Sequence, residues 1–206
     1  MLNDLKRAVC KANRELQVLG AMKFANGSVS GFDPSMGLFV IKPSGVPYSE
    51  LQPELMVVMS LDGQKVEGRL NPSSDMETHR ALYLAWPMLV RGIAHTHSTY
   101  ATAFAHAGKA IHAARAAHSD HPLGDVPVTR LLRPDEIEKD YGFNTGKAIA
   151  EAISDPEKSV AVLVREHGAY TWGKTCAEAA TNAAVLEAAA EMDFIVRLIN
   201  PGMAPG

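Results

Sequence analysis

The sequence feature that most constrains this chain is an apolar run that ends in two histidines, Gly92-Ile93-Ala94-His95-Thr96-His97-Ser98. Side chains alternate faces along a β-strand, so His95 and His97 are expected to point the same way, a few ångströms apart. Borderline-soft metals such as zinc take two of their ligands in this geometry. The alternative is a strand that exposes two polar rings to solvent. Other candidate ligands in the chain favour the metal site.

A third histidine and a carboxylate fit the same site. Residues 159–165, which contain the apolar run 160–164, are predicted to be a buried strand, and His167 lies two residues beyond it. Catalytic zinc needs three protein ligands and one open position, which His95, His97 and His167 would provide. Asp75, at a predicted helix start, is a candidate fourth ligand or a base. A structural zinc site would more often use several cysteines, and neither of the two cysteines is placed for that role.

Two serines before a predicted helix indicate an anion site. Ser74 and Glu77 have the spacing of a capping box, which predicts a helix that starts here and ends near Trp86. The N-terminus of such a helix presents free N–H groups and a positive dipole end to an anion, with Ser73 beside them. The alternative is that the two serines only cap the helix.

A lysine at a predicted strand end indicates a second part of the anion site. Lys42 ends the apolar run 37–42 and is followed by Ser44 and Gly45. An ammonium, a hydroxyl and a free amide could together hold a phosphate. An exposed lysine before a simple turn is the alternative.

The remaining patterns predict alternating helices and short strands. The predicted helices cover residues 2–19, 98–107, 133–153 with an interruption at 142–146, and 176–198. Further strands are predicted at residues 55–60, 65–69, 111–117, 126–129 and 170–173. Within the helix that follows Asp75, His79 is predicted to be a packed or surface residue rather than a ligand. The small residues at 26–31 predict a hairpin turn, with an anion-approaching loop as the alternative.

Composition narrows the range of functions. The 206 residues carry a formal net charge of −3 and show no basic stripe, which does not favour a nucleic-acid partner. The apolar runs, such as 160–164, are far shorter than the about 20 residues of a membrane span. The first residues mix acid and base without an apolar core, so no signal peptide is expected. Two isolated cysteines, Cys10 and Cys176, suit a reduced cytoplasm.

Four motifs occur together in one order and spacing: Lys42-Pro43-Ser44-Gly45, Pro72-Ser73-Ser74-Asp75, His95-Thr96-His97-Ser98, and His167-Gly168 with Trp172-Gly173-Lys174. In these motifs the chain resembles the class II aldolase/L-ribulose-5-phosphate 4-epimerase family, from Met1 to about Asn200. Asp75, the segment His118-Ser119-Asp120 and residues 141–146 resemble the epimerase branch. The fuculose- and rhamnulose-phosphate aldolases usually carry Glu at the Asp75 position.

The resemblance implies an α/β fold, with a central, mainly antiparallel sheet flanked by helices. One domain would cover residues 1–200, and residues 201–206 would form a short flexible tail. It further implies a cytoplasmic homotetramer with fourfold symmetry and active sites between subunits. One Zn²⁺ per subunit, with Mn²⁺ or Co²⁺ as alternatives, would be held by His95, His97 and His167 with Asp75 close to it. The implied substrate-phosphate residues are Gly27, Ser28, Lys42, Ser44, Gly45, Ser73 and Ser74.

The implied activity is zinc-dependent 4-epimerisation of L-ribulose 5-phosphate to D-xylulose 5-phosphate. The metal would chelate the C2 carbonyl and C3 hydroxyl of the ketose and stabilise an enediolate as the C3–C4 bond breaks. The glycolaldehyde phosphate fragment would then turn over and recondense. Two proton carriers are needed on opposite faces, and Asp120 matches the position of one.

The chain departs from the family pattern at three places. The usual Gly-Asn-Val-Ser is Gly27-Ser28-Val29-Ser30, and the usual Gly-Thr-Thr-His is Arg115-Ala116-Ala117-His118. Epimerases continue beyond such a tail to a tyrosine that acts as the second acid/base, whereas this sequence ends at Gly206. We therefore expect slow epimerisation or release of cleavage products.

Three other functions stay open at this point. A class II aldolase acting on a related ketose phosphate and a non-catalytic zinc and sugar-phosphate binder both fit the motifs. A metal-dependent hydrolase could also use three histidines and a carboxylate, but it would leave the phosphate loops unexplained.

Overall fold

The computed structural model describes residues 2–21, 27–112 and 123–202. Its centre is a seven-stranded sheet in the order β4-β3-β2-β1-β5-β9-β8. Every neighbouring pair of strands in it is antiparallel. The strands are β1 (Gly27–Asp33), β2 (Leu38–Ile41), β3 (Val57–Ser60), β4 (Lys65–Glu67), β5 (Gly92–Thr96), β8 (Ala161–Val164) and β9 (Gly168–Gly173). A separate pair joins β6 (Ile111–His112) to β7 (Asp125–Val126).

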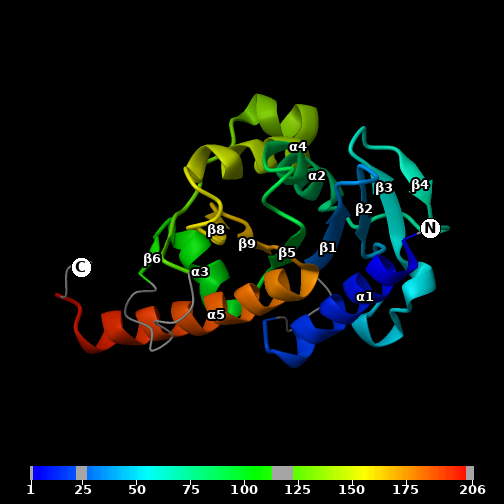
Figure 1. Ribbon diagram of the computed structural model, residues 1–206. Coiled ribbons are helices and arrows are strands. Elements are labelled where there is room, and N and C mark those ends of the chain that lie inside the picture. Colours follow the sequence, from blue (N-terminus) through cyan, green and yellow to red (C-terminus); the bar gives the residue numbers. More distant parts are fainter. Residues whose placement is uncertain (1, 22–26, 113–122, 203–206) are drawn as a thin grey trace.

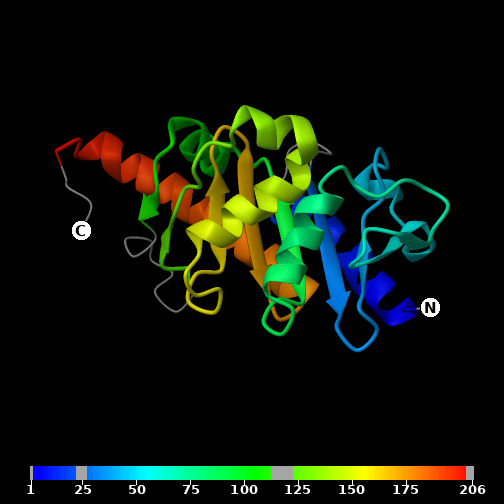
Figure 2. The ribbon, with the colours of Figure 1, turned by 90° about the horizontal axis from the view of Figure 1, so that it is seen from above.

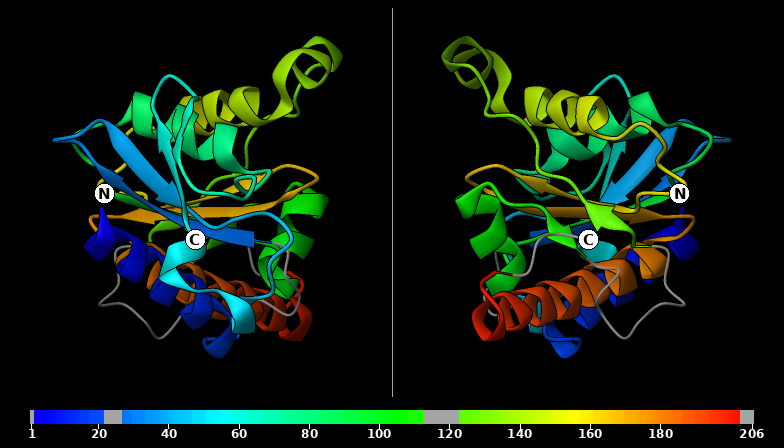
Figure 3. Two further views of the ribbon diagram at one scale, coloured as in Figure 1. Left: turned by 90° about the vertical axis from the view of Figure 1, so that its right-hand side faces the viewer. Right: turned by 90° about the vertical axis from the view of Figure 1, so that its left-hand side faces the viewer.

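Helices cover both faces of the sheet, which gives three layers (Figures 1 and 3). The α-helices are α1 (Asn3–Val18), α2 (Met76–Ala85), α3 (Thr99–Ala107), α4 (Pro134–Ala152) and α5 (Cys176–Ile199). Short 3₁₀ helices lie at η1 (Tyr48–Glu50) and η2 (Pro53–Leu55). Helices α1 and α5 lie on one face, α2 and α4 on the other, and Figure 2 looks onto the α2 and α4 layer. No helix in the described ranges is both long and apolar enough to cross a membrane.

Alternation along the strands sorts side chains between the two layers. In β5, Ala94 packs into the core formed with α1 and α5, whereas Ile93 packs with Leu82 of α2 and Ile149 of α4. His95 lies two residues after Ile93, so it shares the face covered by α2 and α4. The apolar sequence of β5 thus turns its histidine toward the α2 side of the sheet.

Helices α2 and α4 pack closely because glycines face the contact. A Cβ atom on Gly146 would lie 2.5 Å from Cβ of Ala81, and one on Gly142 would lie 2.8 Å from Cβ of Glu77. Thr78 donates a hydrogen bond of 2.8 Å to the carbonyl oxygen of Gly142. Helix α2 and the residues before it are therefore held in one position relative to α4.

The predicted α/β fold with a mainly antiparallel sheet is confirmed, but the hairpin turn predicted at 26–31 is wrong. From Gly27 onward this stretch is the central strand β1, paired with β2 and β5. Small polar residues are accommodated there because Ser28 and Ser30 make buried hydrogen bonds to side chains of the 75–83 segment. Gly31 allows close approach of α1, since a Cβ atom there would lie 2.8 Å from Cδ1 of Leu5.

Two local predictions about helices are also corrected. Ser74 and Glu77 do not form a capping box, since Asp75 is the residue before α2 and makes no side-chain capping bond, while Glu77 bonds to Arg80 at 2.8 Å. The interruption of α4 is at Asp140 (φ −166°, ψ 84°) rather than at 142–146, which is helical. Of the strand predicted at 111–117, residues 111–112 are a strand and the rest lies outside the described residues.

Candidate active site

Three histidines converge where β5 ends and β9 begins. Strand β5 supplies His95 and leads to His97, and the turn between β8 and β9 supplies His167. Their nearest nitrogens are Nε2 of His95 and His97, 2.9 Å apart, and Nε2 of His167 and His95, 3.1 Å apart. One nitrogen from each ring lies within 4.8 Å of the others. Gly168 allows this approach, because a Cβ atom there would lie 2.7 Å from the carbonyl oxygen of Thr96.

The orientation of the central ring fits metal binding. Nδ1 of His95 lies 3.0 Å from the carbonyl oxygen of Ala169, which can only accept a hydrogen bond. Nδ1 therefore carries the proton, and Nε2 presents a lone pair to the other two histidines. Facing ring nitrogens at this spacing are the donor set that a divalent cation such as zinc takes. The residues present therefore fit a metal ion.

Burial keeps two of the three histidines neutral. Burial, and to a smaller extent the neighbouring His95, lowers the pKa of His97 and of His167 to about 4. A metal binds the neutral imidazole, so no proton has to be displaced from these rings at neutral pH. The rings of His167, His95 and Tyr170 also form one stack, with centroid distances of 4.9 and 4.2 Å.

The residues predicted to bind an anion form the other side of the pocket. Two backbone hydrogen bonds of 2.9 Å, from Ser73 N to Lys42 O and from Ser44 N to Asn71 O, hold the two loops side by side. Lys42 is buried, and among the described residues its Nζ contacts the Pro43 carbonyl oxygen at 3.3 Å but no carboxylate. Burial lowers the pKa of Lys42, although the charge of Asp75 opposes that change. This cation is placed to receive an anion.

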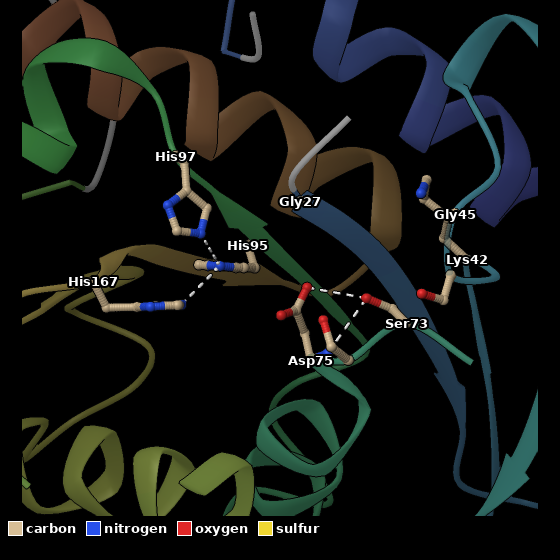
Figure 4. Close-up of a pocket in the computed structure, with 10 residues that line it drawn as sticks. Gly27, Lys42, Gly45, Ser73, Asp75, His95, His97 and His167 are labelled. Atoms are coloured by element: carbon tan, nitrogen blue, oxygen red, sulfur yellow. Dashed lines mark hydrogen bonds between the residues drawn. The ribbon is translucent and has the colours of Figure 1, made fainter. Parts of the chain in front are cut away.

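Asp75 lies between the two halves of the site. Figure 4 shows the histidine rings on one side of it and Ser73 and Lys42 on the other. Its Oδ2 accepts hydrogen bonds from Ser28 (2.8 Å) and Ser73 (3.1 Å). Burial acts to raise the pKa of this carboxyl, but the imidazoles of His95 and His79 and the two hydroxyls outweigh it and lower the pKa. Asp75 is therefore a carboxylate at neutral pH.

The structure brings most of the predicted site residues to one pocket of about 310 Å³. Its lining consists of Gly27, Lys42, Ser44, Gly45, Ser73, Ser74, Asp75, His95, His97 and His167. Ser28 is not in this lining; it is fully buried behind Asp75. Asp120 lies outside the described residues. His79 is fully buried, as the prediction of a packed histidine allowed.

Sequence reasoning gave no site role to two tyrosines, although Tyr141 begins the segment 141–146 that resembles the epimerase branch. Tyr170 stacks on His95 because the two are direct partners across β5 and β9. Tyr141 places its ring edge-on to His167, at 5.8 Å between centroids. The register between distant strands and the kink in α4 produce these contacts, and no local pattern signals them.

The sheet flanked by helices and the three-histidine cluster define an α/β protein with a candidate metal site, beside a pocket that contains a buried lysine. The sequence matches the class II aldolase and adducin N-terminal domain over residues 7–194. The chain belongs to this class II aldolase family.

Similar proteins include both epimerases and aldolases. The chain is 46% identical to "L-ribulose-5-phosphate 4-epimerase UlaF" of Salmonella typhi, over 99% of this chain and 90% of that protein. Among solved structures, an "L-fuculose 1-phosphate aldolase" matches with a TM-score of 0.79 and 25% identity, over 98% of this chain and 89% of that one. YgbL of Klebsiella pneumoniae, a putative aldolase/epimerase/decarboxylase, matches with a TM-score of 0.73 and 26% identity, over 98% and 93% of the chains.

Proposed function

We propose that this protein is a zinc-dependent L-ribulose-5-phosphate 4-epimerase, which forms D-xylulose 5-phosphate by cleaving and remaking the C3–C4 bond. The observation that carries the proposal is the convergence of His95, His97 and His167 on a pocket that also contains the buried Lys42. The relative named as such an epimerase, at 46% identity, supports the choice of substrate.

In this mechanism the two sides of the pocket have different tasks. His95, His97 and His167 would hold the zinc ion, which when bound supplies the Lewis acidity that stabilises negative charge on the ketose oxygens. Lys42, with Ser44 and the serines before α2, would bind the substrate phosphate and fix the position of the sugar chain. Separate metal and phosphate subsites orient the bond to be broken.

Asp75 and Asp120 have the remaining roles. Asp75 is a candidate fourth metal ligand, because its carboxylate lies between the histidines and the anion-binding residues. Asp120 stays a prediction as one of the two proton carriers, with no geometry to describe.

The metal identity and the assembly are further parts of the proposal. We infer zinc rather than Mn²⁺ or Co²⁺ because three imidazoles are a common catalytic zinc set. We infer that the protein is a homotetramer, which is supported by exposed apolar side chains on the last turns of α5, among them Phe194, Leu198 and Ile199. We also infer that it is cytoplasmic. Light scattering should give four times the chain mass of 22.1 kDa.

An aldolase acting on a related ketose phosphate is the second candidate. The structural similarity to an L-fuculose 1-phosphate aldolase favours it, since the fold and much of the site would be shared. A zinc and sugar-phosphate binder without turnover is the third.

Conversion of L-ribulose 5-phosphate, measured with added zinc and with a chelator, tests the proposal. Chelator-sensitive formation of D-xylulose 5-phosphate is the expected result. Accumulation of glycolaldehyde phosphate and dihydroxyacetone instead would show that the protein is an aldolase and not an epimerase. If zinc binds stoichiometrically but no product forms, the remaining candidate is a zinc and sugar-phosphate binder without turnover.

A further inference from the structure

A row of polar side chains leads from the pocket into the core between α2 and β1. Asp75, His79 and Tyr83 follow one another at intervals of four residues, and Ser28 and Ser30 at an interval of two. Four residues of helix advance about 6 Å and two residues of strand about 6.6 Å, so the two sets interleave. Apart from Asp75, which is partly buried, every member is completely buried.

Four short contacts connect these side chains in sequence. Ser28 Oγ lies 2.8 Å from Asp75 Oδ2 and 3.4 Å from His79 Nε2. On the other side of the imidazole ring, Ser30 Oγ lies 2.6 Å from His79 Nδ1 and 2.7 Å from the hydroxyl of Tyr83. The hydroxyl of Ser30 is the one hydrogen-bond partner of the Tyr83 hydroxyl in the described part of the chain. The row therefore has two defined ends.

The two ends determine the direction of every hydrogen bond between them. The Asp75 carboxylate only accepts, so Ser28 gives its single proton to Asp75, and His79 must donate to Ser28 from Nε2. At the far end Tyr83 has one proton and gives it to Ser30, which in turn gives its proton to Nδ1 of His79. The opposite direction would leave the Tyr83 proton without an acceptor and Asp75 without its shorter bond.

The surroundings of His79 agree with this assignment. Burial lowers the pKa of His79 to about 3, so the ring is neutral at physiological pH. A neutral imidazole is a donor at one nitrogen and an acceptor at the other, which the row requires. Ser28 is also the direct partner of His95 across β1 and β5, so the row ends beside the histidine cluster.

We propose that His79 is a positioning residue, which acts through the Ser28 hydroxyl to hold the Asp75 carboxylate in its orientation toward the pocket. The effect of His79 on turnover rests on the proposed function, but the hydrogen bonding of His79 does not. Groups that orient the residues around a metal affect affinity or activity by about 10- to 100-fold when removed.

The tautomer of His79 is the first test. Protein labelled with ¹⁵N-histidine is studied by long-range ¹H–¹⁵N NMR, and the His79 signals are assigned by their loss in a His79→Gln variant. We expect a neutral ring with the proton on Nε2, whether or not the protein turns over any sugar phosphate. A proton on Nδ1, or a charged ring, would overturn the proposal without affecting the proposed function.

Two substitutions at His79 then separate positioning from packing. In His79→Gln the amide reaches the Nε2 position and can still donate to Ser28, whereas in His79→Asn it reaches only the Nδ1 position. We expect His79→Asn to lower kcat about 10- to 100-fold with little change in KM, and His79→Gln to recover at least about tenfold of that loss. Thermal unfolding of both variants checks that each is folded. Equal losses in two folded variants would contradict the proposal.

Discussion

At the scale of single residues, the site depends on side chains whose orientation is fixed by their neighbours. His95 is fixed by the Ala169 carbonyl on one side and by the ring of Tyr170 on its face. Lys42 is a buried cation without a contacting carboxylate among the described residues. The isolated charge of Lys42 and the facing nitrogens of the three histidines are both unfavourable in a protein interior unless a ligand completes them. Metal and phosphate binding would remove that cost.

The metal site is tested by replacing one of its ligands. We expect His167→Ala to lose most of the bound zinc, since two remaining histidines leave the ion's coordination incomplete. The measurement is zinc content by elemental analysis after dialysis. His106→Ala is the control, because His106 is an exposed histidine of the neighbouring α3 outside the cluster. Equal zinc content in the wild type and in both variants would show that His167 is not a zinc ligand.

The phosphate site is tested through Lys42. A hydrogen bond to a charged group is worth about 1.5–3 kcal/mol, so Lys42→Met should raise KM for the sugar phosphate about 10- to 100-fold. The variant should not be less stable, because an apolar chain of similar length replaces a buried charge. Steady-state kinetics check this, with the exposed Lys109→Met as control. An unchanged KM would show that Lys42 does not bind the substrate phosphate.

At the scale of elements, the packing of α2 against α4 positions parts of the site. Helix α2 follows Asp75, and its position depends on the glycine-mediated contact with α4. The kink of α4 at Asp140 directs Tyr141 to His167. The pocket is therefore shaped by helix packing as well as by its own lining.

The need for glycine at the contact between α2 and α4 is tested with Gly146→Ala. Alanine favours a helix, but here its Cβ would lie 2.5 Å from Cβ of Ala81 and 3.0 Å from the Thr78 carbonyl oxygen. We expect a net loss of about 1–3 kcal/mol in the free energy of unfolding, as is usual for overpacking. Urea unfolding measures it. Glu138→Ala, at an exposed site of α4, should stay within about 0.5 kcal/mol of the wild type.

At the scale of the whole molecule, the buried apolar side chains of the described residues form three clusters around the central sheet. Ion pairs at the start of α4 make part of the stability of the protein depend on pH. Glu136 is bound by Arg130 at 2.7 and 2.9 Å and accepts from the Arg133 N–H at 2.8 Å. These bonds, led by those from Arg130, lower the pKa of Glu136 to about 2.

The pH dependence of unfolding follows from this lowered pKa. A carboxyl whose pKa is lower in the folded state stabilises the protein above its unfolded pKa of about 4.5, and this stabilisation disappears as the pH falls toward about 2. We expect Glu136→Gln to lower Tm at neutral pH and the difference to shrink through that window. The control Glu138→Gln should show no such trend. A constant difference for Glu136→Gln would contradict the assignment.

The sequence by itself determined which three histidines are candidate ligands and, through the family resemblance, the class of fold. His95 and His97 share a face because strand side chains alternate, and the order of the four motifs is typical of the family. The pocket lining contains the predicted residues with the exception of Ser28 and of Asp120, which is not described. Local spacing accounts for residues within one motif, such as His95 and His97, and the family resemblance supplied the rest of the set.

Only the tertiary structure decided what surrounds that set. The place of Gly27–Asp33 as the central strand, the stack of Tyr170 on His95 and the row from Tyr83 to Asp75 depend on register between segments far apart in the chain. Small polar residues predict a turn when read locally, since turns favour them. In the folded protein, buried partners on α2 satisfy their hydroxyl groups, and that compensation exists only after the helix lies on the sheet.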